Sequence, residues 1–325
     1  MVKQAIRTVV LCLLAWGIWR TVGKAGDELP LYGVSWSDID WKWSVVTGLF
    51  YVAGLLPCWI FWHRTLRAMG QEPRWRESLR AFWIGHLGKY VPGKAMVVVL
   101  RAGLVYSDRV NRTVAATSVF VETLTMMAVG AFVASVVLLL ISDKPWLTLL
   151  AFGLMVCSGG PTFPPVFRRI VRTLQVKRAN PEIETAIAGV DYRLMATGWI
   201  SIAAGWTLLG LSLWATLWSL GARPGPSEVP LLTATVGLAM VAGFLSLIPG
   251  GLGVRDWILV ELLAPGYGVA MAFASAILLR VIWLLAELLL SAILYVDVRR
   301  ARGISSATTH QGGGDGGNAA EQLGT

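Results

Sequence analysis

The sequence predicts an all-α polytopic membrane protein with about six transmembrane helices and two oppositely oriented re-entrant helical hairpins, arranged as an inverted repeat. The chain of 325 residues is 55% hydrophobic and 14% charged, whereas a soluble domain has about a quarter of its residues charged. Its mean hydropathy is +0.63. Two long apolar stretches are interrupted near their middle by Pro-Gly. These observations exclude an ordinary soluble enzyme.

Uninterrupted apolar stretches give the predicted spans, because a helix needs about 20 mostly apolar residues to cross a membrane. The predicted spans are 5–22, 44–62, 113–141, 145–160, 197–220 and 269–296. In the first, the apolar run from Val9 to Trp19 follows Lys3 and Arg7, and no small-residue cleavage site comes after it. We therefore expect it to be retained as a signal-anchor.

Two further apolar stretches are broken, and we expect them to form hairpins. The first covers about 75–106 and the second about 229–264, and the predicted breaks include Pro92, Pro249 and Gly253. Proline removes a backbone donor and glycine weakens a helix. Irregular backbone at membrane depth is tolerated where protein buries it or where it lines a wet cavity. The alternative is that each Pro-Gly only kinks a full span.

Loop charges predict the orientation. The basic loops at 62–82, 106–112, 168–178 and 299–302 should face the cytoplasm, and the acidic segment 27–40 should lie outside. The first broken stretch would then enter from the cytoplasm and return, and the second would do so from outside. Both termini are expected in the cytoplasm, and the protein in the cell (inner or plasma) membrane.

This arrangement predicts one integral membrane domain over 1–302, with repeat 1 at about 44–141 and repeat 2 at about 197–297. Inverted repeats with interrupted helices are how many transporters build a site at the midplane. Residues 163–176 alternate arginine with apolar residues, which predicts an interfacial amphipathic helix. Residues 303–325 are rich in Gly, Ser and Ala, and we expect a disordered cytoplasmic tail.

Charged residues inside apolar stretches are the candidate functional residues, because each costs roughly 2.5–3.5 kcal/mol at a helix centre on insertion scales. They are Lys89, Lys94 and Arg101 at the first break, Arg255, Asp256 and Glu261 at the second, and Glu122, Arg280 and Glu287 on the long spans that follow. Cations converging near helix N-termini favour an anion such as a lipid phosphate.

Each candidate also has a structural alternative. Glu122 and Arg280 could pair with each other or with the hairpin charges, as struts. Arg101 could extend to the cytoplasmic interface. Glu287 could be a buried acid held neutral.

Other classes of function lack a signature. The sequence contains no metalloprotease, serine-hydrolase or P-loop motif, and its histidines are scattered, so we expect no enzyme activity, cofactor or metal. The net charge of +9 lies in short loops, which favours contact with anionic headgroups over nucleic acid.

Two motifs resemble those of the lysylphosphatidylglycerol synthase transmembrane-region family, also called the flippase-like membrane family. GKYVPGK at 88–94, followed by Arg101, resembles the family's GKYxPGK…R signature, and PGGLGVRD at 249–256 resembles PGGLGVRE. Ser118 to Glu122 is similar to its S-x-x-x-E-R span, with Thr123 in place of the usual Arg, and Arg280 matches an Arg of the last span. The chain resembles a stand-alone member, without a synthase domain.

The resemblance implies a lipid flippase or transporter that binds polar-headgroup lipids, with a membrane phospholipid or lipid-linked glycan as its partner. Lys94 and Arg255 would hold an anionic headgroup, and Glu122 and Arg280 would line or gate the path. The full predicted binding set is Lys89, Gly93, Lys94, Arg101, Glu122, Gly250, Gly251, Arg255, Asp256 and Arg280. The alternative is a non-transporting subunit that presents lipid to a separate glycosyl- or aminoacyl-transferase. A membrane-embedded transferase is a third, weaker hypothesis, and an oligomer is left open.

Overall fold

The computed structural model describes residues 19, 23, 27–90, 95–141, 144–173, 183–246 and 253–311, with side chains through Val296 in the last helix. The regular elements of this part of the chain are all helical. They are η1 (Leu29–Tyr32), η2 (Trp36–Asp38), α2 (Trp41–Ala68), α3 (Trp75–His86), η3 (Leu87–Tyr90), α4 (Ala95–Val105), α5 (Arg112–Ile141), α6 (Pro145–Gly159), η4 (Gly160–Thr162), α7 (Pro164–Thr173), α8 (Ile183–Ala188), α9 (Tyr192–Ser219), η6 (Pro226–Glu228), α10 (Val229–Leu245), α11 (Val254–Tyr267) and α12 (Val269–Gln311).

The same order of elements occurs twice: a long helix, a pair of shorter helices and a second long helix. The first set is α2, α3, α4 and α5, and the second is α9, α10, α11 and α12. Both sets begin with an aspartate N-cap, since Asp40 accepts from the Lys42 amide at 3.0 Å and Asp191 accepts from the Leu194 amide at 2.7 Å. Such caps satisfy N–H groups that have no partner within the helix.

Each pair of shorter helices is a hairpin whose two ends lie together. We call α3, η3 and α4 hairpin 1, and α10 and α11 hairpin 2. At the base of hairpin 1, the Glu72 amide donates to the Arg109 carbonyl at 3.2 Å, and the Asn111 amide donates to Gln71 Oε1 at 2.6 Å. At the base of hairpin 2, the Tyr267 hydroxyl donates to Glu228. Both stretches therefore turn back to where they started.

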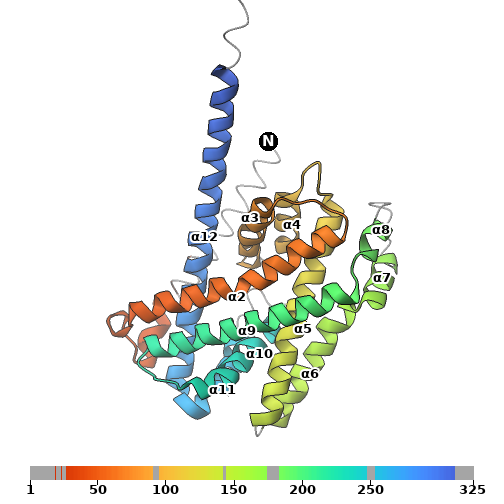
Figure 1. Cartoon of the computed structure of the whole chain (residues 1–325). Helices are drawn as coiled ribbons and strands as arrows, with labels where there is room; N and C mark the ends of the chain where they lie inside the picture. The colour runs from red at the N-terminus through yellow and green to blue at the C-terminus, as the bar shows by residue number, and fades with distance from the viewer. Residues whose placement is uncertain are drawn as a thin grey trace, which may run out of the picture.

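The long helices α2 and α9 pack along each other, with hairpin 1 on one side of the pair and hairpin 2 on the other (Figure 1). The hairpins also contact the long helices of both sets. In hairpin 1, α4 packs on α5 and α3 packs on α12. In hairpin 2, α11 packs on α12 and α10 packs on α5. Both hairpins are thus held between α5 and α12.

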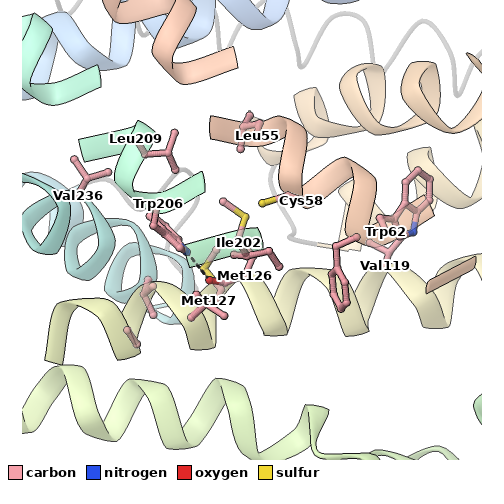
Figure 2. Packing of buried hydrophobic residues seen from close by; sticks show 14 of the residues in the cluster. Leu55, Cys58, Trp62, Val119, Met126, Met127, Ile202, Trp206, Leu209 and Val236 are labelled. Atoms are coloured by element: carbon pink, nitrogen blue, oxygen red, sulfur yellow. Dashed lines mark hydrogen bonds between the residues drawn. The ribbon is translucent and has the colours of Figure 1, made fainter. Parts of the chain in front are cut away.

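The main core lies where α2, α5, α9 and α10 meet. Figure 2 shows Trp206 among buried residues of these helices, with its indole N–H donating to the Met126 carbonyl at 2.9 Å. Trp206 is 1% exposed. A buried indole N–H needs such a partner, because a polar group left unpaired in an apolar medium is costly.

Five helices of the described chain are long and apolar enough to cross a membrane, and a sixth results if the bent pair α6 and α7 counts as one span. The predicted spans 44–62, 113–141, 145–160, 197–220 and 269–296 coincide with α2, α5, α6, α9 and the first part of α12. The predicted span 5–22 lies outside the described residues, apart from Trp19.

Three helical segments have other lengths or boundaries than the sequence predicted. Residues Pro226–Leu245, η6 and α10 together, are long enough to cross a membrane by themselves, although they form only the first arm of hairpin 2. The predicted amphipathic helix at 163–176 is α7, which bends by 68° from α6. The last helix, α12, continues to Gln311, into the predicted tail, and residues 312–325 lie outside the described chain.

Candidate functional site

The end of the first arm of hairpin 1 is bound to α12 by an ion pair between the partly exposed Lys89 and the buried Glu287. Lys89 Nζ lies 2.5 Å from Glu287 Oε1, and the Glu287 side chain is 0% exposed. The Tyr51 hydroxyl of α2 donates to the same oxygen. His86 Nε2 lies 3.2 Å from Lys89 Nζ. We call Tyr51, His86, Lys89 and Glu287 the Glu287 cluster.

A second buried ion pair connects the other arm of hairpin 1 to α5. Arg101 NH1 donates to Glu122 Oε2 at 2.6 Å, and the two residues are 2% and 1% exposed. The guanidinium lies 4.0 Å from the ring centroid of Phe82. Gly85 makes room for Arg101, since a Cβ at Gly85 would lie 2.4 Å from Arg101 Cγ. Arg101 NH2 also donates to His86 Nδ1 at 3.3 Å, which joins this pair to the Glu287 cluster.

Hairpin 2 presents two charged side chains at the start of α11. Gly253 precedes the helix with φ of +84°, a conformation that favours glycine. Asp256 accepts from Arg280 NH2 of α12 at 2.5 and 2.6 Å. The Arg255 guanidinium lies 5.0 Å from the ring centroid of Trp283, also on α12, and Arg255 is 9% exposed.

The two hairpins meet at one pair of aromatic rings. Tyr51 and Trp283 stack with centroids 4.4 Å apart and an interplanar angle of 17°. Lys89 of hairpin 1 donates to the Tyr51 hydroxyl at 3.3 Å, and Arg255 of hairpin 2 lies over Trp283. The cations of the two hairpins are therefore brought to the same place by residues of α2 and α12.

The charges of this region do not balance among the described residues. Its three carboxylates, on Glu122, Asp256 and Glu287, are each paired with a cation, namely Arg101, Arg280 and Lys89. Arg255 is the fourth cation, and within the described chain its NH2 has no hydrogen-bond partner. Glu287 Oε2 is likewise buried without a described partner. The region therefore carries one excess buried positive charge.

Comparison with known protein families matches residues 5–291 to the family described as the lysylphosphatidylglycerol synthase TM region. The chain belongs to this family. A search of the curated proteins found no match. Membership indicates a membrane role related to lipid, since the matched region is the transmembrane part of the family.

For this lysylphosphatidylglycerol synthase TM-region protein, the structure brings most of the predicted charged residues together. Lys89 and Arg255 meet at the Tyr51–Trp283 pair, and Arg101, Glu122, Asp256 and Arg280 form the two adjoining ion pairs. Glu261 instead pairs with Lys144 at 2.6 Å. Six predicted residues lie outside the described chain: Pro92, Gly93, Lys94, Pro249, Gly250 and Gly251.

The structure also decides between the alternatives for individual residues. Glu122 and Arg280 do not pair with each other; each holds a hairpin charge, as the strut alternative predicted. The alternative that Arg101 extends to the interface does not fit the structure, because Arg101 is buried and paired with Glu122. Thr123, in place of the family's usual Arg, donates to Glu122 at 3.2 Å.

Three residues of the region were not predicted. Tyr51 and Trp283 are each one of several aromatic residues in an apolar helix, and nothing in their local sequence separates them from lipid-facing rings. His86 stands two residues before the GKYVPGK run, so its position near a motif was an available signal. The described residues contain no cluster of three or more His, Cys, Asp or Glu that could hold a metal ion.

Proposed function

We propose that this protein binds the anionic headgroup of a membrane lipid at the ends of its two hairpins and moves that lipid across the membrane. The observation that carries the proposal is Arg255, a buried guanidinium with no carboxylate at hydrogen-bond distance among the described residues. An uncompensated buried charge is strongly unfavourable. A lipid phosphate or carboxylate would supply the missing negative charge.

The surroundings of Arg255 suit a lipid better than a free anion. Its guanidinium offers a fork of donors that matches a phosphate or carboxylate. The ring of Trp283 beside it is apolar, and the neighbouring helices are of membrane-spanning length. Lys89 contributes a second cation near the same rings. From the family resemblance we expect Lys94 and the glycines Gly93, Gly250 and Gly251 to complete the site.

The hairpins supply a route for the lipid in this proposal. Each turns back on itself, and they lie on opposite sides of the α2–α9 pair. Hairpins that enter from opposite faces of the bilayer would open the site to each side in turn, as in other transporters with inverted repeats. The Arg101–Glu122 and Arg280–Asp256 pairs would hold the hairpins against α5 and α12 during this movement.

The proposal is tested by lipid binding and lipid movement in the same protein. Lipids that co-purify with the wild type, Arg255→Gln and Glu77→Gln are identified by mass spectrometry. Glu77 is a matched control, because it pairs with Arg109 at the base of hairpin 1, away from Arg255. Movement of a fluorescent phosphatidylglycerol is then followed in vesicles of phosphatidylglycerol and phosphatidylcholine.

We expect enrichment of an anionic lipid, and its movement, in the wild type and Glu77→Gln, and loss of both in Arg255→Gln. A lipid profile equal to the bulk membrane in all three proteins would contradict the headgroup site. Selective binding without movement would contradict transport and support the alternative of a subunit that presents lipid to a separate transferase.

A further inference from the structure

His86 has a fixed role in the hydrogen bonds that surround Glu287. Arg101 always carries its charge, so its NH2 donates to His86 Nδ1 at 3.3 Å and that nitrogen is an acceptor. A neutral imidazole then carries its hydrogen on Nε2. Nε2 lies 3.2 Å from Lys89 Nζ and 3.6 Å from Glu287 Oε1. The Nε2–H group of His86 therefore lies near Glu287 Oε1, to which Lys89 and Tyr51 already donate.

The donors gather at one oxygen of Glu287 and leave the other bare. Lys89 and Tyr51 both donate to Oε1. Oε2 is buried and has no hydrogen-bond partner among the described residues. A bare anionic oxygen in a low-dielectric interior is unfavourable. A proton on it removes that charge and leaves Oε1 able to accept, but it also leaves the Lys89 ammonium without its counter-charge, which an anionic headgroup would have to supply. Oε2 is thus the atom of the cluster best placed to take up a proton.

The charge state of Glu287 depends on the titratable and charged groups that face it, which come from four elements of the described chain. Tyr51 faces it from α2, His86 from α3, and Lys89 from η3. Tyr90 of η3 also faces Glu287, with which its hydroxyl interacts, and its ring centroid lies 5.1 Å from Lys89 Nζ. Arg255 of α11 lies across the stacked rings of Tyr51 and Trp283. Among these groups Glu287 is the one negative charge.

We propose that Glu287 Oε2 is a proton-binding site and that the proton and the anionic lipid headgroup are bound and carried together. The proton comes from water and bonds to Oε2, so the Glu287 cluster changes from neutral to singly positive. Arg255 already carries an excess positive charge nearby, and the added charge would repel it. A negatively charged headgroup offsets both charges, so each ligand increases the affinity for the other. This inference rests on the proposed function, because it needs the headgroup beside Arg255.

The proposal is tested first on lipid movement. Wild type, Glu287→Gln and Glu77→Gln are placed in vesicles of phosphatidylglycerol and phosphatidylcholine, with and without a difference of pH across the membrane. We expect the gradient to change the wild-type rate, by up to about tenfold per pH unit, since the occupancy of one site changes by no more than that. Glu77→Gln should follow the wild type, and Glu287→Gln, which mimics the protonated acid, should lose the dependence on the gradient.

A second measurement is independent of transport. Infrared difference spectra of the purified wild type, taken across a pH titration in light and heavy water, report the C=O stretch of a protonated carboxyl group. The exposed carboxyl groups give bands of this kind too, so the variants are compared: we expect one band that is retained in Glu77→Gln and lost in Glu287→Gln.

The outcomes separate this inference from the proposed function. Lipid movement that does not respond to the gradient in the wild type would overturn the coupling and leave the proposed function intact. If the wild type moves no lipid, the proposed function fails, and the infrared band decides the proton site. A wild-type spectrum without a band lost in Glu287→Gln would overturn the site, whether or not that variant folds well enough for transport.

Discussion

The two hairpins are built alike but are held in different ways. Hairpin 1 is tied by two ion pairs: Lys89–Glu287 to α12, with side chains 27% and 0% exposed, and Arg101–Glu122 to α5, with side chains 3% and 2% exposed. Hairpin 2 has the Arg280–Asp256 pair, whose side chains are 17% and 22% exposed, and it carries Arg255 over the Trp283 ring. Lys89 and Arg101 of hairpin 1 therefore each have a carboxylate partner, whereas Arg255 of hairpin 2 has none among the described residues.

We infer from this difference that the charged residues of hairpin 1 mainly stabilise the fold, whereas Arg255 of hairpin 2 is available to bind a ligand. Buried ion pairs are costly to break from one side, because the remaining charge stays in the interior. A cation without a partner can be removed without leaving such a charge behind. The stability of hairpin 1 should therefore depend on its charged residues, and the stability of hairpin 2 should not depend on Arg255. Substitutions at the two hairpins test this directly.

The largest effect is expected for Glu122→Gln. It leaves the Arg101 guanidinium buried and without its counter-charge, which should lower the free energy of unfolding by about 3–5 kcal/mol. Thermal unfolding in detergent, followed by the fluorescence of the buried tryptophans, measures the change. The double variant Arg101→Met/Glu122→Gln is the control, and it should recover most of the loss. Equal loss in the single and the double variant would show that the charge itself is not the cause.

A smaller loss is expected for Lys89→Met, at the other ion pair of hairpin 1. Glu287 loses its cation but keeps the Tyr51 hydroxyl as a donor, so the free energy of unfolding should fall by about 2–3 kcal/mol. Thermal unfolding in detergent measures the change, and a loss as large as that of Glu122→Gln would contradict the expected order.

The positions of the helices and most of the charged residues of the site could be predicted from the sequence. Apolar length located the spans close to their helices, because a membrane span needs a long uninterrupted run, and Pro-Gly marked both hairpins. The cost of charge in an apolar segment singled out Lys89, Arg101, Glu122, Arg255, Asp256 and Arg280 before any contact was known. The pairing of Glu122 and Arg280 with hairpin charges was one of the arrangements considered, and the structure shows it.

The partners could not be predicted, because they are set by packing between distant segments. Tyr51 meets Trp283 and Glu287 across more than two hundred residues of chain, and no local pattern marks such a contact. The sequence left open whether Arg101 reaches the interface or lies inside, because its burial depends on Glu122, which belongs to the next helix. The sequence also did not predict that α12 continues to Gln311. Apolar length marks only the part of a helix that can cross the membrane, and a helix can continue where its composition turns polar.

The smallest effect on stability is expected for Arg255→Met, the matched change in hairpin 2. Its removal leaves no buried carboxylate unpaired, since Asp256 keeps Arg280 and Glu287 keeps Lys89. The loss of the contact with Trp283 costs about 0.5–1 kcal/mol at most, and removal of an uncompensated charge offsets it. In detergent without added anionic lipid, the unfolding midpoint should therefore stay close to that of the wild type. Addition of phosphatidylglycerol should then raise the midpoint of the wild type and of the control Glu77→Gln more than that of Arg255→Met, because a ligand stabilises only the protein that binds it. A large loss of stability in Arg255→Met without lipid would instead place Arg255 among the supporting residues and remove the distinction between the two hairpins.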